Sequence, residues 1–131
     1  MNIAFVYRGK HLCTPALSGG ILPGITRDSI LTLAPDLGLT VEQTRIDVSE
    51  ALRDIERGHV TEVFAMGTGA VIAPVGRLGY RGHDYVIQGN QPGPVAQRSY
   101  QELTDIQYGR TADRYGWTRM VRCSPGEFSN R

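Results

Sequence analysis

The chain has 131 residues, of which 40% are hydrophobic and 21% are charged, a composition typical of a folded domain. This length suits one domain with its own core. The formal net charge of +1 gives no electrostatic case for binding nucleic acid or an anionic membrane. No apolar run reaches membrane-spanning length and no secretory leader is recognisable, so we expect a soluble, cytoplasmic protein.

Cysteine and histidine usage gives no sign of a metal centre. Cys13 and Cys123 are far apart and no CxxC motif occurs, so we expect free thiols in a reducing compartment, with a bridge between them as the alternative. The histidines are scattered and are expected at the surface. Lys10 is the only lysine in the chain, and it falls in a predicted turn. Chemistry that needs a lysine amine therefore has one poor candidate.

The apolar pattern predicts an α/β fold, with a mixed sheet or partial barrel and two main helices. A short third helix is expected after Ser49, which is a plausible N-cap, and Pro35 should kink or shorten the first main helix. Glu62 lies in a predicted strand and is expected to face solvent, with a polar partner as the alternative. The strands are predicted at residues 3–7, 11–14, 41–48, 60–66, 70–75, 77–80 and 85–88, and the main helices at 25–37 and 94–108.

Residues 21–29 combine an apolar segment, a turn and the start of a helix. Pro23 and Gly24 favour a sharp turn, and the periodic apolar positions that follow predict a helix. The N-terminus of a helix presents unpaired N–H groups and the positive end of its dipole, so a phosphate or carboxylate is favoured there. Thr26 adds a hydroxyl donor. The alternative is that Thr26 or Asp28 simply caps the helix.

A second turn, formed by Gly67, Thr68 and Gly69, follows another predicted strand. It offers backbone N–H groups and a hydroxyl, so the two turns together could hold one phosphate from two sides. The alternative is an ordinary turn between strands. The segment is neither a Walker loop nor a dinucleotide-binding fingerprint, because the residues that follow do not fit either motif.

Several motifs in order resemble one enzyme family, the branched-chain aminotransferases. Residues 14–29 closely resemble their phosphate-binding segment, and residues 62–77 resemble their second cofactor loop. The similarity continues through the second main helix to about Trp117. The resemblance implies a fold-type IV enzyme that uses pyridoxal 5'-phosphate and transfers amino groups between leucine, isoleucine or valine and 2-oxoglutarate.

The resemblance assigns site residues by position. The substrate carboxylate would lie near Gly69 and Ala70, and family members often carry alanine where Gly69 stands. Thr26 and Thr68 would contribute their hydroxyls to the cofactor phosphate. The residues that the resemblance implies for cofactor binding are Gly24, Ile25, Thr26, Gly67 and Thr68.

The resemblance also implies parts that these residues do not contain. In the family, the Schiff-base lysine and the carboxylate that pairs with the pyridine nitrogen precede the strand that residues 1–7 resemble. Residues 1–118 would then be an incomplete C-terminal large domain and residues 119–131 a flexible tail. No catalytic residue is assigned in this chain, and we expect it to be inactive by itself.

Other functions remain open on the sequence alone. The chain could be a non-catalytic remnant, or a module that binds a phosphate-bearing ligand. It could also be a relative of the D-amino-acid transaminases or aminodeoxychorismate lyases. The expected partners are small amino acids and 2-oxo acids, together with either a second copy of the chain or a missing N-terminal half.

Overall fold

The computed structural model describes residues 1–122. Most of the expected tail, residues 119–131, therefore lies outside the described residues, as does Cys123. Within the described part, no helix is long and apolar enough to cross a membrane.

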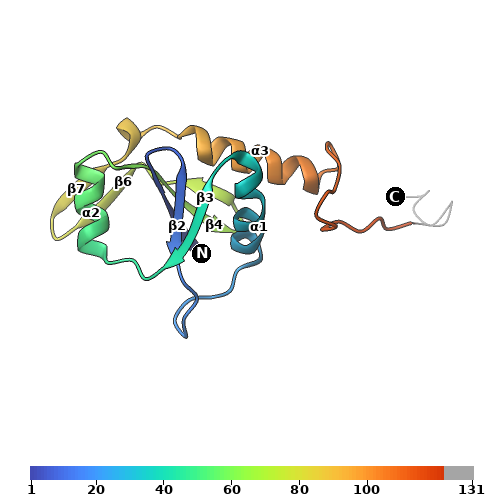
Figure 1. The fold of residues 1–131 in the computed structure, drawn as a ribbon, viewed down its shortest axis with the longest axis horizontal. Coiled ribbons are helices and arrows are strands. Elements are labelled where there is room, and N and C mark those ends of the chain that lie inside the picture. The colour runs from blue at the N-terminus through green and yellow to red at the C-terminus, as the bar shows by residue number, and fades with distance from the viewer. Residues whose placement is uncertain (123–131) are drawn as a thin grey trace, which may run out of the picture.

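The fold is built on a mixed five-stranded sheet, which confirms the α/β prediction (Figure 1). The strand order is β3-β2-β1-β4-β5, with β1 and β4 near the centre. Every neighbouring pair is antiparallel except β2 and β3, which run parallel because a helical segment connects them. The strands are β1 (Asn2–Tyr7), β2 (His11–Pro15), β3 (Thr40–Thr44), β4 (Val60–Gly67) and β5 (Val71–Pro74).

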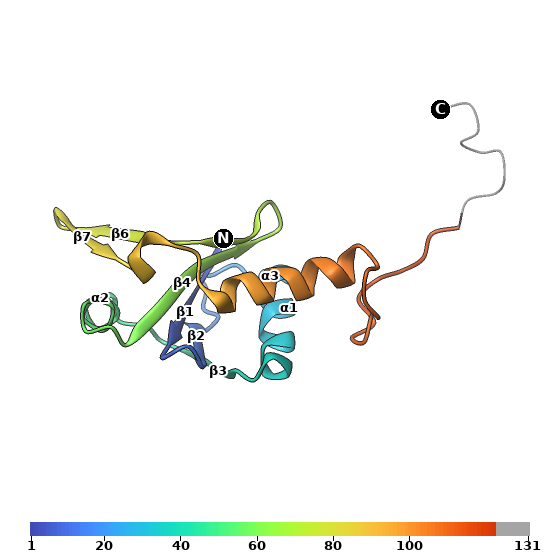
Figure 2. The ribbon, with the colours of Figure 1, turned by 90° about the horizontal axis from the view of Figure 1, so that it is seen from above.

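Two helices cover one face of this sheet. Figure 2 shows α1 (Ile25–Leu33) and α3 (Pro94–Gln107) on the same side of the central strands. Alternate residues of β1, Ala4 and Val6, face these helices and are fully buried. Phe64 of β4 completes this part of the core.

The other face carries a second, smaller core. It is covered by α2 (Val48–Glu56) and by a separate hairpin of β6 (Arg77–Tyr80) and β7 (His83–Val86). Phe5 points to this side, as the two-residue period of a strand requires. A short 3₁₀ helix, η2 (Gln88–Asn90), then leads toward α3.

Proline and glycine end the first helix as expected. Helix α1 gives way to a 3₁₀ helix, η1 (Ala34–Leu37), with Pro35 in its first turn. Pro35 lacks an N–H, so it is tolerated at the start of a new helical segment but not inside α1. Gly38 follows with φ of 82°, a left-handed conformation that costs glycine little.

Three local predictions were wrong. The N-cap of α2 is Asp47, whose side chain accepts a hydrogen bond from the Glu50 N–H, so Ser49 lies inside the helix. Strand β3 correspondingly ends at Thr44 rather than near residue 48. The β6–β7 turn contains only Arg81 and Gly82, both with positive φ, which fits the twist of a two-residue hairpin.

The expectation that Glu62 faces solvent was also wrong. Glu62 is only 3% exposed, and its two carboxylate oxygens each accept a 2.9 Å hydrogen bond, from the N–H groups of Val95 and Ala96. These are amides of the first turn of α3, so the carboxylate satisfies unpaired donors and lies at the positive end of the helix dipole. Gly93 permits the approach, because a Cβ there would lie 2.1 Å from the Glu62 carboxyl carbon.

We expect Glu62→Ala to lower the free energy of unfolding by about 3 kcal/mol, because two buried N–H groups lose a charged acceptor. Urea denaturation followed by circular dichroism measures this change. The matched control is Glu56→Ala, which removes an exposed carboxylate and should change stability by less than about 0.5 kcal/mol. Equal effects of the two substitutions would contradict this role.

Candidate functional site

Two segments that are distant in sequence meet in one pocket of about 420 Å³. One segment is the turn that leads into α1, and the other is the turn that leaves β4. The pocket therefore brings together Gly24, Ile25 and Thr26 with Gly67, Thr68 and Gly69, while Ala70 is not among its lining residues. A larger hollow, of about 500 Å³, is lined only by the continuous segment of residues 45–49, so it gathers no distant groups.

The N-terminus of α1 contributes free hydrogen-bond donors to this pocket. Its N-cap is Gly24, whose backbone is extended and which provides no side-chain cap, so the alternative that Thr26 or Asp28 caps the helix was wrong. The first helical hydrogen bond runs from the Asp28 N–H to the Gly24 carbonyl oxygen, over 3.1 Å. The preceding amides of the helix, including those of Ile25 and Thr26, lack acceptors among the described residues.

Asn2 holds the α1 turn against the sheet. Its side-chain amide donates a 3.1 Å hydrogen bond to the carbonyl oxygen of Leu22. On the sheet side, Asn2 pairs with Met66, immediately before the second turn of the pocket. A Cβ at Gly24 would lie 2.8 Å from the Asn2 side-chain nitrogen, so any larger residue there would displace this amide.

The second turn joins β4 to β5 and supplies the opposite wall. Gly67 pairs with Val71 across the hairpin, which leaves Thr68, Gly69 and Ala70 as the exposed turn. Val71 has a φ of 62°, a strained conformation for a β-branched residue. No atom lies within 4 Å of a Cβ built on Gly69, so an alanine would fit there without displacing a neighbour.

Arg27 also lines the pocket, and sequence reasoning did not assign it a role. It is 4% exposed and donates to two neutral acceptors, the Pro15 carbonyl oxygen at 3.1 Å and the Gln43 side-chain oxygen at 2.7 Å. Its buried Nε has no partner, and no carboxylate of residues 1–122 forms an ion pair with it. Its positive charge is therefore uncompensated beside a helix N-terminus.

The donor set fits a phosphate group. It consists of amides at a helix N-terminus, two threonine hydroxyls and a buried guanidinium, all of which favour an anion. None of the lining residues is Asp or Glu, so no fixed negative charge opposes it. The pocket thus combines a helix N-terminus with a lining whose chemistry favours an anion.

Comparison with known proteins defines the family. The sequence profile described as Amino-transferase class IV matches residues 1–78, so the chain belongs to this family. Class IV aminotransferases depend on pyridoxal phosphate, in agreement with the character of the pocket. This confirms the resemblance noted in the sequence at the level of the family.

The individual relatives are branched-chain aminotransferases. The chain is 51% identical over 117 residues to a probable branched-chain-amino-acid aminotransferase of Staphylococcus epidermidis, covering 89% of this chain and 32% of that protein. It is 48% identical over 120 residues to the branched-chain-amino-acid aminotransferase of Mycobacterium tuberculosis, and the match covers 89% of this chain and 33% of that protein.

The fold comparison agrees. The structure superposes on the branched-chain amino acid aminotransferase of Thermobaculum terrenum in its PLP-bound holo form with a TM-score of 0.70 and 32% identity, covering 84% of this chain and 33% of that one. The chain thus spans about a third of the length of these relatives.

We expect Gly24→Ala to lower the free energy of unfolding by about 1 kcal/mol, because the new methyl group displaces Asn2 from its hydrogen bond with Leu22. Gly69→Ala is the control, since the same methyl group there enters open space. Chemical denaturation of the two variants compares them directly. A Gly24→Ala variant as stable as Gly69→Ala would show that the close approach to Asn2 is not a constraint.

Proposed function

We propose that this chain forms the phosphate-binding part of a branched-chain aminotransferase, which exchanges amino groups between leucine, isoleucine or valine and 2-oxoglutarate. The observation that carries the proposal is the meeting of the α1 N-terminus and the β4–β5 turn in one pocket without acidic residues. The names of the similar proteins support the substrate class.

In this proposal the chain binds the phosphate of pyridoxal 5'-phosphate. The amides of Ile25 and Thr26 and the Thr26 hydroxyl would donate from one side, and Gly67 and Thr68 from the other. Gly24 would allow the turn to approach, as it does for Asn2. When bound, the cofactor supplies an electron sink for the substrate's reacting carbon. The residues of this chain hold its phosphate and thereby fix its orientation.

The β4–β5 turn would also serve the substrate. We propose that the N–H groups of Gly69 and Ala70 bind the substrate carboxylate beside the phosphate. Ala70 does not line the pocket itself, but it belongs to the same exposed turn. A small residue at position 69 leaves the turn open toward the substrate.

Lys10 does not fit the role of the catalytic lysine. It is exposed in the turn that follows β1, whereas the pocket lies at the start of β1, beside Asn2. An amine for the covalent steps would therefore come from outside these 131 residues, and the chain alone would not turn over. Residues 1–118 would then act as the C-terminal part of a large domain, in a homodimer or with an N-terminal half. The unsuitable position of Lys10, the only lysine of these 131 residues, favours a non-catalytic phosphate-binding module as the second candidate.

We expect Thr26→Val and Thr68→Val each to weaken the binding of pyridoxamine 5'-phosphate about tenfold, since each removes one hydroxyl donor. Isothermal titration calorimetry of the purified chain measures the affinity, and pyridoxamine without phosphate gives the contribution of the phosphate. Thr32→Val is the control, because its exposed hydroxyl is engaged with the Asp28 carbonyl oxygen on α1.

Two results would overturn the proposed site. One is equal affinity of the unmodified chain for pyridoxamine and its phosphate. The other is a Thr26→Val variant that binds as well as Thr32→Val.

A further inference from the structure

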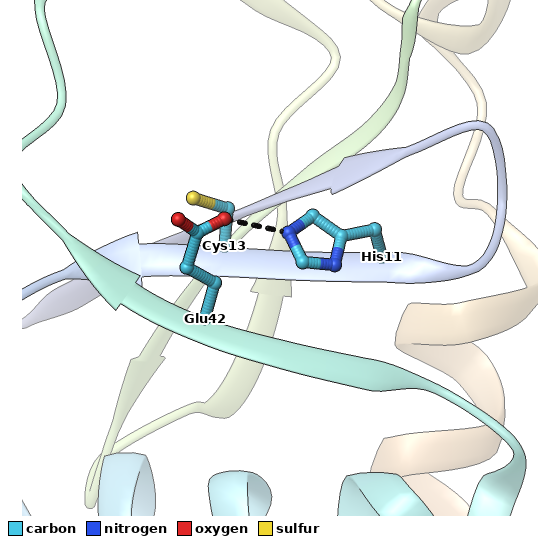
Figure 3. Close-up of side chains that lie close together, drawn as sticks. All are labelled: His11, Cys13 and Glu42. Carbon is cyan, nitrogen blue, oxygen red and sulfur yellow. Dashed lines mark hydrogen bonds and ion pairs between the residues drawn. The ribbon is translucent and has the colours of Figure 1, made fainter.

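We infer that His11, Cys13 and Glu42 form a binding site for a divalent transition-metal ion of the zinc type. The site lies where strands β2 and β3 pair (Figure 3). It lies outside the proposed phosphate pocket and shares no lining residue with it. The inference is independent of the proposed aminotransferase function.

The strand register places the three side chains together. His11 and Cys13 are two residues apart on β2, so they project from the same face. Glu42 is the direct partner of Cys13 on the parallel strand β3. One donor atom from each of the three residues lies within 4.8 Å of the other two, and Figure 3 shows the three side chains close together, with the contact between Glu42 and His11 dashed.

The donors are a nitrogen, a sulfur and an oxygen, a set that zinc accepts. Zinc–ligand distances of about 2.0–2.3 Å require donor atoms to lie roughly 3.3–3.6 Å apart in a tetrahedral site. The Nε2 of His11 lies 2.8 Å from a Glu42 carboxylate oxygen, so these two would separate slightly. Their side chains are 37% and 53% exposed, which leaves them free to adjust. Three ligands leave a fourth position for water.

Thr40 already orients the imidazole for this role. Its hydroxyl oxygen lies 2.6 Å from Nδ1 of His11, on the opposite side of the ring from Glu42. Metal-binding histidines commonly donate their second N–H to such a partner, which fixes the tautomer and the ring direction. Without a metal ion, Nε2–H would donate to the Glu42 carboxylate. Metal binding would displace that proton, and with Nδ1–H donating to Thr40 the Nε2 lone pair would bind the ion.

The surroundings favour a cation. The three residues line a pocket of about 240 Å³ whose wall also includes Asp47, Glu50 and Asp54, against the single guanidinium of Arg45. Burial, followed by the Asp54 carboxylate, raises the pKa of Tyr7 on the same wall to about 12. The carboxylates around the buried Cys13 thiol outnumber the one guanidinium, and a bound cation would neutralise part of this negative charge.

The alternative is a simple His11–Glu42 ion pair beside an inert buried thiol. The chain offers a comparison, because Nε2 of His83 lies 3.1 Å from a Glu56 carboxylate oxygen at the surface, and no thiol of residues 1–122 belongs to that pair. An adventitious histidine–carboxylate site would bind metal equally well at both places. The proposed three-ligand site differs from such a pair because its metal binding requires the Cys13 thiolate.

The test is a titration of the untagged chain with Co²⁺, which gives a charge-transfer absorption when a thiolate binds it. A Cys123→Ser background leaves Cys13 as the single thiol. We expect one Co²⁺ per chain with this absorption, and its loss in Cys13→Ser. Competition between Zn²⁺ and bound Co²⁺ gives the Zn²⁺ affinity. Relative to the Cys123→Ser chain, we expect this affinity to be at least tenfold weaker in Glu42→Gln and about tenfold weaker in Thr40→Val.

The control is His83→Gln, which should leave the Co²⁺ spectrum and the Zn²⁺ affinity unchanged. Circular dichroism of each metal-free variant checks that it is folded. Zn²⁺ should also raise the thermal unfolding midpoint of the Cys123→Ser chain, because the bound ion would link β3 to β2. It should not raise the midpoint of the chain that also carries Cys13→Ser. The inference is overturned if no thiolate absorption appears in the Cys123→Ser chain, or if Cys13→Ser binds Zn²⁺ with unchanged affinity.

Discussion

The antiparallel pairing of β1 with β4 is the constraint on which the rest of the structure depends. Both strands are buried on both faces, because α1 and α3 pack on one side of the sheet. On the other side, α2 and the β6–β7 hairpin cover it. The pairing also sets the site, because Asn2 lies opposite Met66 where β4 ends. From that position Asn2 binds the Leu22 carbonyl oxygen and holds the α1 turn beside the β4–β5 turn.

The three α-helices differ in what occupies their N-termini, and this difference singles out one of them. Helix α2 is capped by Asp47, and α3 is capped by the buried carboxylate of Glu62. Helix α1 has no side-chain cap, and the uncompensated charge of Arg27 adds to the positive potential at its first turn. The same physical need, a negative group at a helix N-terminus, is met from within the chain in two cases. In the third, at α1, no side chain of residues 1–122 supplies such a group.

Local chemistry was enough to predict most elements and the two turns. Pro35 and Gly38 end the first helical segment where expected, and Pro94 begins α3. Some errors are misplaced element boundaries, such as Asp47 in place of Ser49 as the N-cap of α2. The error at Glu62 concerns a contact between distant residues. Whether Glu62 faces water or α3 depends on packing across the sheet, and the strand pattern does not contain that information. The proximity of Glu42 to His11 and Cys13 likewise depends on a parallel pairing set by the α1 crossover.

The central claim is that the free amides of α1 and the β4–β5 turn bind a phosphate. The most direct measurement is the amide nuclear magnetic resonance spectrum of the chain during titration with pyridoxamine 5'-phosphate. We expect the largest shifts at Ile25, Thr26 and Thr68, and little change at Val95 and Ala96, whose amides are already bound by Glu62. Shifts confined to α3, or none at Ile25 and Thr26, would contradict this claim.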